Sequence, residues 1–379
     1  MVETLTSSHE FEHEPNHEIE QKFIPLFPEK LDRFRESAQP VEQFYLSHPS
    51  EEFSLRLRES SDDGWLVHTA TLKSAGRSSP SGLDRLEVET PIDAMTYDLY
   101  KQQDVPTIKK LRAEPMKNIV VDFFEDGQVL IESENPISLA AFTGRYGLAD
   151  GLAEVTGDRT ADNEWRAHFT YRQEHGGYAA LEPAEALNVS SIVDQLWRNI
   201  SKSSLTTVAV CGRSGSGKST LVKEITGQLE QLGIKSLVLS TDDYHRGKSW
   251  LEHHKGGPWT DWDDPIVYDT AELVEDLRRL SNGQSIVKRR FDFASEEPVF
   301  DGVISPASVV VIEGIYAGSV DVDPTFRYDL PTPLATCIGR RLLRDMTERP
   351  QFAEPSRSLR YMIEQAEPAY RRQLKEVSL

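Results

Sequence analysis

The sequence has 379 residues, a length that predicts about two domains. Its formal net charge of −20 argues against general nucleic-acid binding, and its two cysteines argue against a disulfide framework or a cysteine zinc site. No apolar run approaches the roughly 20 residues of a membrane span, and the acidic N-terminus does not resemble a signal peptide. We therefore expect a cytoplasmic protein without nucleic-acid or membrane partners.

The first half of the chain predicts a domain rich in strands. An acidic flexible tail is expected over residues 1–16, because this stretch has several Glu and no Lys or Arg. From residue 18 to about 171, short runs alternate apolar with charged residues between turn-rich stretches, which indicates an antiparallel barrel or sandwich. The main strands are expected at 18–24, 53–58, 67–73, 86–90, 108–113, 118–124 and 129–133, with helices at 29–37 and 91–102.

The second half predicts an α/β domain with a parallel sheet, because apolar strands alternate with amphipathic helices. Strands are expected at 205–211, 236–239 and 309–312, and helices at 191–201, 219–232, 270–281 and 333–349. Two adjacent glycines and a proline interrupt any periodicity between the two halves. The predicted organisation is a tail at 1–16, a first domain at 17–175, a linker at 176–190 and a second domain at 191–379.

A phosphate-binding loop is predicted at residues 212–220, which read GRSGSGKST between an expected strand and an expected helix. Glycines let the backbone wrap around a phosphate chain, and the exposed amides and the helix N-terminus attract its negative charge. We expect Lys218 to reach the β- and γ-phosphates of ATP and Ser219 to hold Mg²⁺. The other expected ATP ligands are Gly212, Ser214, Gly215, Gly217 and Thr220.

Three further features support phosphoryl transfer. Glu313 directly follows a continuous apolar strand, where a carboxylate projects toward the phosphate loop and its metal. Asp242 lies just past another strand, at the sheet edge where α/β proteins bind ligands, and is a candidate catalytic base. Arg341, Arg344 and Arg349 have the spacing of one helix face and are candidates to stabilise transferring charge. The alternatives are a capping Glu, a turn Asp and a solvated basic helix.

In this order, these features resemble the uridine kinase and phosphoribulokinase family of P-loop kinases, over about residues 205–372. The resemblance implies transfer of phosphate from ATP to a hydroxyl of a small molecule. It assigns Asp242 as the base, Glu313 to the neighbourhood of Mg²⁺, and the three arginines to a lid, with Arg341 near ATP. The sequence has Phe291 where uridine kinases have Tyr, and Glu296 about where they have His. The acceptor is therefore left open.

Pairs of like charges recur at period two in the first domain, as in Glu18-x-Glu20 and Arg56-x-Arg58. Alternate residues of a strand share one face, so a barrel interior that carries both signs is expected. Basic side chains there suit polyanionic oxygens, and acidic ones suit divalent cations that bridge to them. The alternative for any single pair is an ordinary half-exposed strand.

The segment Glu18-x-Glu20-x-Lys22, with the later charged pairs, resembles the CYTH or triphosphate tunnel metalloenzyme family over about residues 17–175. The resemblance implies an antiparallel tunnel that binds tripolyphosphate or a nucleoside triphosphate with Mg²⁺ or Mn²⁺. It assigns Glu18, Glu20, Glu132 and Glu134 to the metal, and leaves the Glu87 and Glu89 pair to either metal or structure. It assigns to the triphosphate the basic residues Lys22, Arg56, Arg58, Lys73, Lys110 and Arg112.

The leading hypothesis is an ATP-binding phosphotransferase with a small hydroxyl acceptor, fused to a metal-dependent tunnel that binds or hydrolyses a triphosphate or polyphosphate. One alternative is an inorganic triphosphatase or pyrophosphatase whose P-loop domain is regulatory. Another is a non-catalytic sensor of nucleotide or polyphosphate. The sequence names neither the acceptor nor the oligomeric state.

Overall fold

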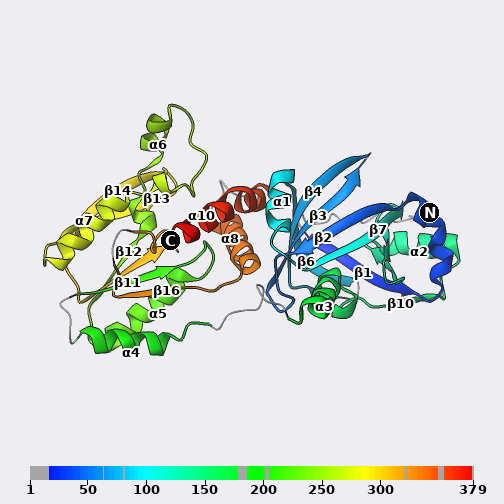
Figure 1. Cartoon of the computed structure of the whole chain (residues 1–379), viewed down its shortest axis with the longest axis horizontal. Coiled ribbons are helices and arrows are strands. Elements are labelled where there is room, and N and C mark those ends of the chain that lie inside the picture. Colours follow the sequence, from blue (N-terminus) through cyan, green and yellow to red (C-terminus); the bar gives the residue numbers. More distant parts are fainter. Residues whose placement is uncertain are drawn as a thin grey trace, which may run out of the picture. The chain divides into compact units, whose positions relative to one another are not determined.

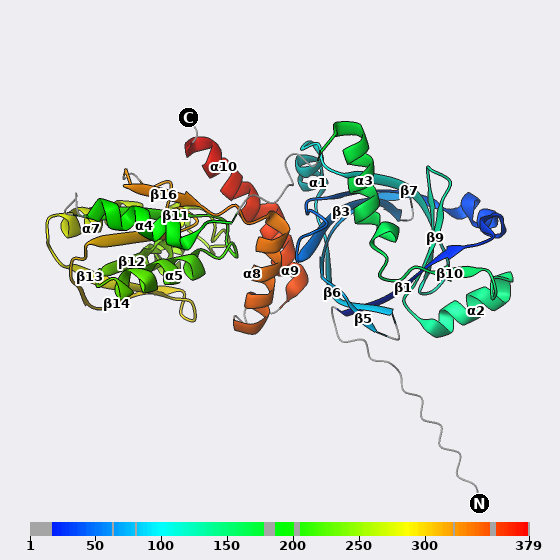
Figure 2. The ribbon, with the colours of Figure 1, turned by 90° about the horizontal axis from the view of Figure 1, so that it is seen from below.

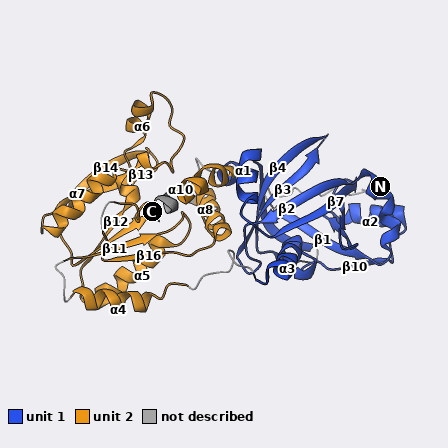
Figure 3. Cartoon of the chain, viewed as in Figure 1, with its two compact units in different colours: residues 1–182, 355–359 blue, residues 183–354, 360–379 orange. Residues whose placement is uncertain are grey.

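The computed structural model describes residues 17–62, 64–79, 82–177, 186–200, 205–320, 323–348 and 354–377. The chain divides into two compact units, residues 1–182 with 355–359 and residues 183–354 with 360–379 (Figure 3). The domain limits drawn from the sequence remain a proposal, and the expected tail and part of the expected linker lie outside the described residues. Within the described part of the chain, no helix is both long and apolar enough to cross a membrane.

Unit 1 is built on an antiparallel barrel of eight strands in the order β1-β9-β8-β7-β2-β3-β4-β6, which closes where β6 pairs with β1 (Figures 1 and 2). Two short strands extend it, since β10 pairs with β1 and β5 pairs with β6. The strands are β1 (His17–Pro25), β2 (Gln39–Tyr45), β3 (Phe53–Asp62), β4 (Trp65–Ser74), β5 (Arg77–Ser79), β6 (Gly82–Pro91), β7 (Thr107–Met116), β8 (Ile119–Phe124), β9 (Val129–Ser133) and β10 (Leu152–Glu154). The helices are η1 (Pro28–Ser37), α1 (Ala94–Lys101), α2 (Pro136–Tyr146), η2 (Arg159–Ala161) and α3 (Asn163–His175).

Period-two alternation decides which side chains face the interior of this barrel. On β8, Val121 and Phe123 are buried in a cluster with Phe34 of η1 and Phe142 of α2. Asp122 lies between them on the opposite face of the strand and pairs with basic residues of β7. The apolar core of unit 1 is therefore shared between strands and covering helices, and charged side chains are left for the interior.

Unit 2 contains an all-parallel sheet in the order β12-β15-β11-β16 and a separate antiparallel hairpin, β13-β14. The strands are β11 (Thr206–Cys211), β12 (Ser236–Ser240), β13 (Ile286–Asp292), β14 (Glu297–Ile304), β15 (Val309–Gly314) and β16 (Phe326–Asp329). The helices are α4 (Val189–Ile200), α5 (Lys218–Gln231), η4 (Thr241–Tyr244), α6 (Lys248–Lys255), η5 (Pro265–Val267), α7 (Thr270–Ser281), α8 (Leu334–Glu348), α9 (Pro355–Tyr361), the π-helical turn η7 (Met362–Ala366) and α10 (Glu367–Val377).

The two central strands of this sheet, β15 and β11, are buried on both faces, which explains their continuous apolar residues. Val208 and Val210 of β11 pack in a cluster with α4 and α5, whereas Ala209 and Cys211 pack in a second cluster with α7. The two fold classes expected from the sequence, an antiparallel barrel followed by a parallel-sheet P-loop fold, are confirmed.

Several elements differ from the sequence-based expectation. Four features were not predicted from the sequence: α3, β2, β16 and the β13-β14 hairpin. β16 has only four residues and alternates aromatic with charged side chains, so it lacks the apolar run of a central parallel strand. The strand at 86–90 begins earlier, at Gly82. This extension brings Arg85 into the barrel wall.

Candidate functional sites

The phosphate loop of unit 2 joins the end of β11 to the start of α5, as the sequence predicts. Gly217 caps the helix with a φ of 95°, in the left-handed region that glycine adopts without strain. A Cβ atom on Gly215 would lie 2.2 Å from the carbonyl oxygen of Cys337 in α8. This glycine therefore allows α8, which carries the arginines, to approach the loop.

Lys218 is held inside the loop. Its Nζ donates hydrogen bonds to the carbonyl oxygens of Gly212 at 3.0 Å and Arg213 at 2.8 Å. Burial lowers the pKa of the Lys218 ammonium, although the negative charges of Glu313 and Asp242 oppose this effect. The ammonium is thus placed to serve a phosphate that follows the loop.

Glu313 and Asp242 emerge from neighbouring strands at one edge of the sheet, because Ser240 of β12 lies opposite Glu313 of β15. The Oγ of Ser219 lies 3.5 Å from Oε2 of Glu313. Burial raises the pKa of the Glu313 carboxyl, and the charge of Asp242 adds to this. The backbone N–H of Asp242 donates to the Oγ of Ser240, which starts the turn η4.

These side chains line one cavity of about 530 Å³. The predicted residues in its wall are Ser214, Gly215, Gly217, Lys218, Ser219, Thr220, Asp242, Glu313, Arg341 and Arg344. Gly212 contributes through its carbonyl bond to Lys218. Arg349 lies outside the described residues. The structure therefore brings the described members of the predicted set together around the loop.

The far end of this cavity is aromatic. The ring of His245 lies 4.0 Å from that of Phe291 and 5.2 Å from that of Trp262, measured between centroids. Burial lowers the pKa of His245 to about 4, so the imidazole is neutral at pH 7. Glu296 also lines the cavity, and its carboxylate is paired with Lys248 at 2.6 Å. His245 was not among the residues predicted from the sequence.

Asp263, another acid in the wall of this cavity, is held by Tyr361, Arg341 and Tyr316. The hydroxyl of Tyr361 donates to Oδ2 of Asp263 at 2.6 Å, and Arg341 lies 3.7 Å from the same oxygen. The hydroxyl of Tyr316 donates to the backbone carbonyl of Asp263. Arg341, predicted for ATP, therefore also contacts the segment around Asp263.

The barrel of unit 1 encloses a second cavity of about 410 Å³, which we call the tunnel. Its wall contains the predicted residues Glu18, Glu20, Lys22, Arg56, Arg58, Lys73, Arg112, Glu132 and Glu134. The strand register places Glu18 opposite Arg85, Lys22 opposite Glu132, Lys73 opposite Glu87 and Arg112 opposite Asp122. The charges predicted to face inward therefore lie beside charges of opposite sign.

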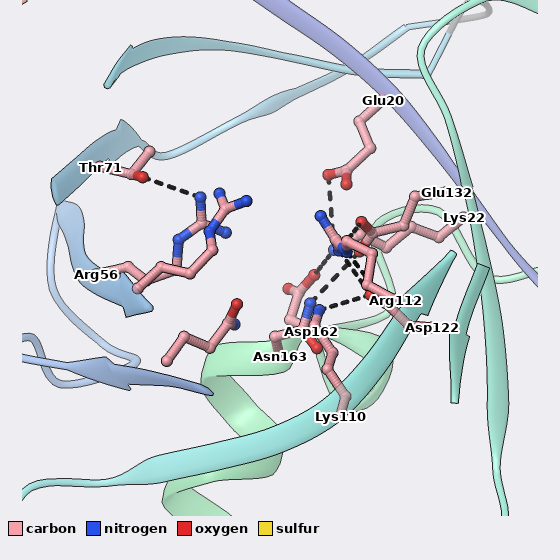
Figure 4. A network of polar contacts seen from close by, with 12 residues as sticks. Glu20, Lys22, Arg56, Thr71, Lys110, Arg112, Asp122, Glu132, Asp162 and Asn163 are labelled. Carbon is pink, nitrogen blue, oxygen red and sulfur yellow. Dashed lines mark hydrogen bonds and ion pairs between the residues drawn. The ribbon is translucent and has the colours of Figure 1, made fainter. Parts of the chain in front are cut away.

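Asp122 organises the cations of β7 (Figure 4). Arg112 donates to its two oxygens at 2.7 and 2.6 Å and reaches Glu132 at 2.8 Å. Lys110 lies 2.5 Å from the same carboxylate, and its side chain has no exposed area. Burial, reinforced by the charge of Arg112, lowers the pKa of Lys110 to about 7. Lys110 thus lies behind Arg112, and its assignment to the triphosphate remains a proposal.

Lys22 and Arg56 occupy separate parts of the tunnel wall (Figure 4). Lys22 lies 2.6 Å from Asp162 and 3.6 Å from Glu20. Arg56 donates to the hydroxyl of Thr71 at 2.9 Å. Asp162 was not a sequence candidate, because it precedes α3, outside the predicted strands.

Arg85 and Lys73 face the acidic end of the tunnel. Arg85 lies 2.9 Å from Glu18 and 2.7 Å from Glu20, and Lys73 lies 2.8 Å from Glu18 and 3.2 Å from Glu87. Arg85 was not predicted from the sequence, although it lies two residues before Glu87 and so shares its face of the strand. Within the described residues, no three His, Cys, Asp or Glu side chains gather in a way that would hold a metal ion.

The pKa values of Glu134 and Glu132, two carboxyls of the tunnel wall, are shifted in opposite directions. Burial raises its pKa, and the charges of Glu18, Glu87 and Glu20 raise it further. Glu132 behaves oppositely: burial alone would raise its pKa, but the charges of Arg112 and Lys110 hold it well below the usual range. Negative charge is therefore less compensated around Glu134 than around Glu132.

Comparison with known proteins matches residues 207–371 to the model of the phosphoribulokinase/uridine kinase family. A uridine kinase of Clostridium perfringens is 32% identical over 154 residues, which cover 39% of this chain and 71% of the relative. A uridine kinase of Staphylococcus haemolyticus is 30% identical over 157 residues, covering 39% of this chain and 72% of the relative.

Two solved structures are similar to separate parts of the chain. A putative fructose transport system kinase from Silicibacter sp. TM1040 has a TM-score of 0.43 at 18% identity and covers 50% of this chain and 95% of its own. The inorganic triphosphatase NE1496 has a TM-score of 0.26 at 23% identity and covers 40% of this chain and 93% of its own. Scores at this level add nothing to the description of either fold. The sequence relatives carry the assignment, and the chain belongs to the phosphoribulokinase/uridine kinase family of P-loop kinases.

Proposed function

We propose that unit 2 transfers the γ-phosphoryl group of ATP to a hydroxyl of a small molecule. The observation that carries this proposal is the convergence of Lys218, Asp242 and Glu313 on one cavity, with Arg341 and Arg344 in its wall. These are the parts that phosphoryl transfer requires: a phosphate cradle, a base and stabilising positive charge. The uridine kinase relatives support an ATP-dependent reaction on a small acceptor.

In the proposed reaction, Asp242 accepts the proton of the acceptor hydroxyl. The hydroxyl oxygen bonds to the γ-phosphorus, and the bond from that phosphorus to the ADP oxygen breaks. Lys218 and the guanidinium groups of Arg341 and Arg344 offset the negative charge of the transferring group. The neutral, buried ring of His245 contributes shape and hydrogen bonding but no charge.

The residues beside the loop fit a magnesium ion. Ser219 and Glu313 present hydroxyl and carboxylate oxygens 3.5 Å apart, which are the ligand types that Mg²⁺ accepts. The raised pKa of Glu313 reflects burial and the nearby charge of Asp242, both of which a cation offsets. When bound, Mg²⁺ supplies positive charge to the β- and γ-phosphates.

The kinase proposal is tested by phosphate transfer from radiolabelled ATP to a panel of nucleosides, sugars and polyols. We expect one acceptor class to be labelled, and Lys218→Ala to lower kcat/KM by about 100-fold or more, because a preorganised charge on the transferring group is lost. Lys223→Ala is the matched control, since Lys223 lies on the exposed side of the same helix. Equal activity of wild type and Lys218→Ala would refute the assignment.

We propose a second function for unit 1, the binding or hydrolysis of a triphosphate or polyphosphate in the tunnel. The observation that favours it is the row of inward Lys and Arg residues from four strands of a closed barrel, Lys22, Arg56, Arg58, Lys73 and Arg112. The CYTH-like motifs on the same strands support this proposal. The oxygens of a bound phosphate chain would replace the carboxylates that now pair with these cations.

The acidic end of the tunnel has the donor chemistry for Mg²⁺ or Mn²⁺. Glu18, Glu20, Glu87 and Glu134 supply carboxylate oxygens, the ligand type that both cations accept, and the charges of Glu18, Glu87 and Glu20 add to burial in raising the pKa of Glu134. A divalent cation bound there supplies charge neutralisation for phosphate oxygens. The protein residues orient the polyanion and exclude water from its flanks.

The tunnel proposal is tested by phosphate release from tripolyphosphate with Mg²⁺ or Mn²⁺. We expect Glu18→Ala combined with Glu20→Ala to lower this release by about 100-fold, because the proposed cation loses two ligands. Glu29→Ala combined with Glu36→Ala removes the same charge from exposed positions of η1 and serves as the control. Retained release in the first double variant would contradict the proposal.

A further inference from the structure

Arg85 bridges the two carboxylates that the tunnel proposal assigns to a divalent cation. Its Nε donates to Oε2 of Glu18 at 2.9 Å, and a terminal nitrogen donates to Oε2 of Glu20 at 2.7 Å. The three side chains are 13%, 11% and 7% exposed, respectively, so water screens these pairs weakly. The guanidinium lies opposite Glu18 in the strand register and spans both acids of β1.

The tunnel wall has more carboxylates than cationic side chains. Nine carboxylates line the cavity, from Glu18, Glu20, Glu87, Glu89, Glu114, Glu132, Glu134, Asp162 and Glu164. Six cationic side chains line it, from Lys22, Arg56, Arg58, Lys73, Arg85 and Arg112. To hold a polyanion, the Lys and Arg side chains of this wall must turn from the carboxylates to the polyanion. Added cations must then neutralise the carboxylates.

We propose that Arg85 is the resident counter-cation of Glu18 and Glu20, which a divalent cation displaces and a polyanion draws away. The inference rests on the proposed cation and polyanion sites of the tunnel. Arg85 competes with the divalent cation for the same oxygens and so lowers the affinity of the tunnel for that cation. A polyanion that accepts hydrogen bonds from Arg85 frees the two carboxylates and raises that affinity.

Arg85 is better placed for this role than its neighbour Lys73. Lys73 contacts Glu18 and Glu87, whereas Arg85 contacts Glu18 and Glu20, the two acids of the proposed pair. The guanidinium is a planar fork that matches phosphate oxygens as well as carboxylates. The coupling free energy between two bound ligands is the same in both directions. The bound cation therefore raises the affinity of the tunnel for the polyanion by the same factor.

The inference is tested by titrating the full chain with Mn²⁺ and measuring free Mn²⁺ by electron paramagnetic resonance at pH 8. Every protein compared also carries Glu313→Gln, which removes the carboxylate of the cation site proposed in unit 2. We expect Arg85→Gln to bind Mn²⁺ about tenfold more tightly than wild type, within the usual range of coupling between sites. Arg85→Lys keeps a positive charge and should remain close to wild type. Arg166→Gln, which removes a guanidinium paired with Asp126, is the matched control and should not change the affinity.

A second arm of the experiment uses sulfate, a weakly chelating tetrahedral anion, at constant ionic strength. Sulfate should tighten Mn²⁺ binding by wild type and have little effect on Arg85→Gln, whose carboxylates are already released. Circular dichroism checks that each variant is folded, and the sulfate arm on wild type tests the inference without any substitution. Unchanged or weaker Mn²⁺ binding by Arg85→Gln, or no sulfate effect on wild type, overturns the inference. Failure of both proteins to bind Mn²⁺ overturns the proposed cation site with it.

Discussion

Glu164 is a carboxyl group in the tunnel wall whose Oε1 accepts a hydrogen bond from the hydroxyl of Ser47. Burial raises the pKa of Glu164 to about 7, and the hydrogen bonds from Ser47 and Ser54 offset this only in part. At neutral pH the group therefore exchanges its proton readily, unlike the fully ionised Glu132. Burial and neighbouring charge decide these two behaviours of one residue type.

The raised pKa of Glu164 predicts a pH dependence of stability. The folded state holds this proton more tightly than the unfolded state, whose carboxyl titrates near 4.5. The proton on Glu164 therefore contributes fully to the stability of the folded state below pH 4.5. This contribution is lost as the pH rises through about 7. Between pH 5 and pH 8, the free energy of unfolding of unit 1 should fall by about 2 to 3 kcal/mol more in wild type than in Glu164→Gln.

Urea unfolding followed by far-ultraviolet circular dichroism measures this difference. The amide of Gln keeps the size of the side chain and can still accept a hydrogen bond from Ser47, so packing changes little. Parallel pH profiles for wild type and Glu164→Gln would show that the carboxyl does not titrate in this range.

At the scale of elements, the kinase cavity depends on the close approach of η4 to the end of β15. Gly314 ends β15 with a φ of 147°, and a Cβ atom there would lie 1.8 Å from the Oγ1 of Thr241, the residue before Asp242. The glycine thus lets the turn that carries the proposed base reach the strand that carries Glu313.

Gly314→Ala should therefore displace η4 and lower kcat by about 10- to 100-fold, the usual cost of misplacing a reacting group by about an ångström. ATP affinity should change less, because Lys218 and the phosphate loop lie on other elements. Gly227→Ala makes the same chemical change in α5, where the added methyl meets no atom within 4 Å, and should leave kcat unaltered. Isothermal titration with ATP and initial rates separate the two effects, and an unchanged kcat in Gly314→Ala would show that η4 adapts.

At the scale of the whole molecule, each cavity is lined by residues of one unit. The tunnel is built from unit 1, and the kinase cavity is built from unit 2. We therefore expect the two proposed activities to be separable. Lys218→Ala should retain phosphate release from tripolyphosphate within about twofold, and the double variant of Glu18 and Glu20 should retain acceptor phosphorylation, since the two cavities share no lining residue. Loss of both activities in either variant would indicate energetic coupling between the units.

The sequence by itself determined the two fold classes and predicted most of the charged residues that line the two cavities. Residues 212–220 identified the phosphate loop because the loop, the preceding strand and the following helix are local in the chain. The inward charges of the tunnel were found because alternation at period two is also local. The helix α3 and the hairpin β13-β14 were missed because their pattern is weak over short segments and their stability comes from packing.

Only the tertiary structure decided which charges meet. Arg85 and Glu18 are opposite each other because β6 closes the barrel onto β1, and Asp162 reaches Lys22 because α3 returns to the strand ends. Likewise, the contact of Tyr361 with Asp263 joins segments 98 positions apart in the chain. Such pairs depend on strand register and chain return, which no local pattern encodes. The sequence therefore predicted the signs of the charges that line each cavity. The fold determined the partner of each charged side chain, and hence its pKa and its availability to a ligand.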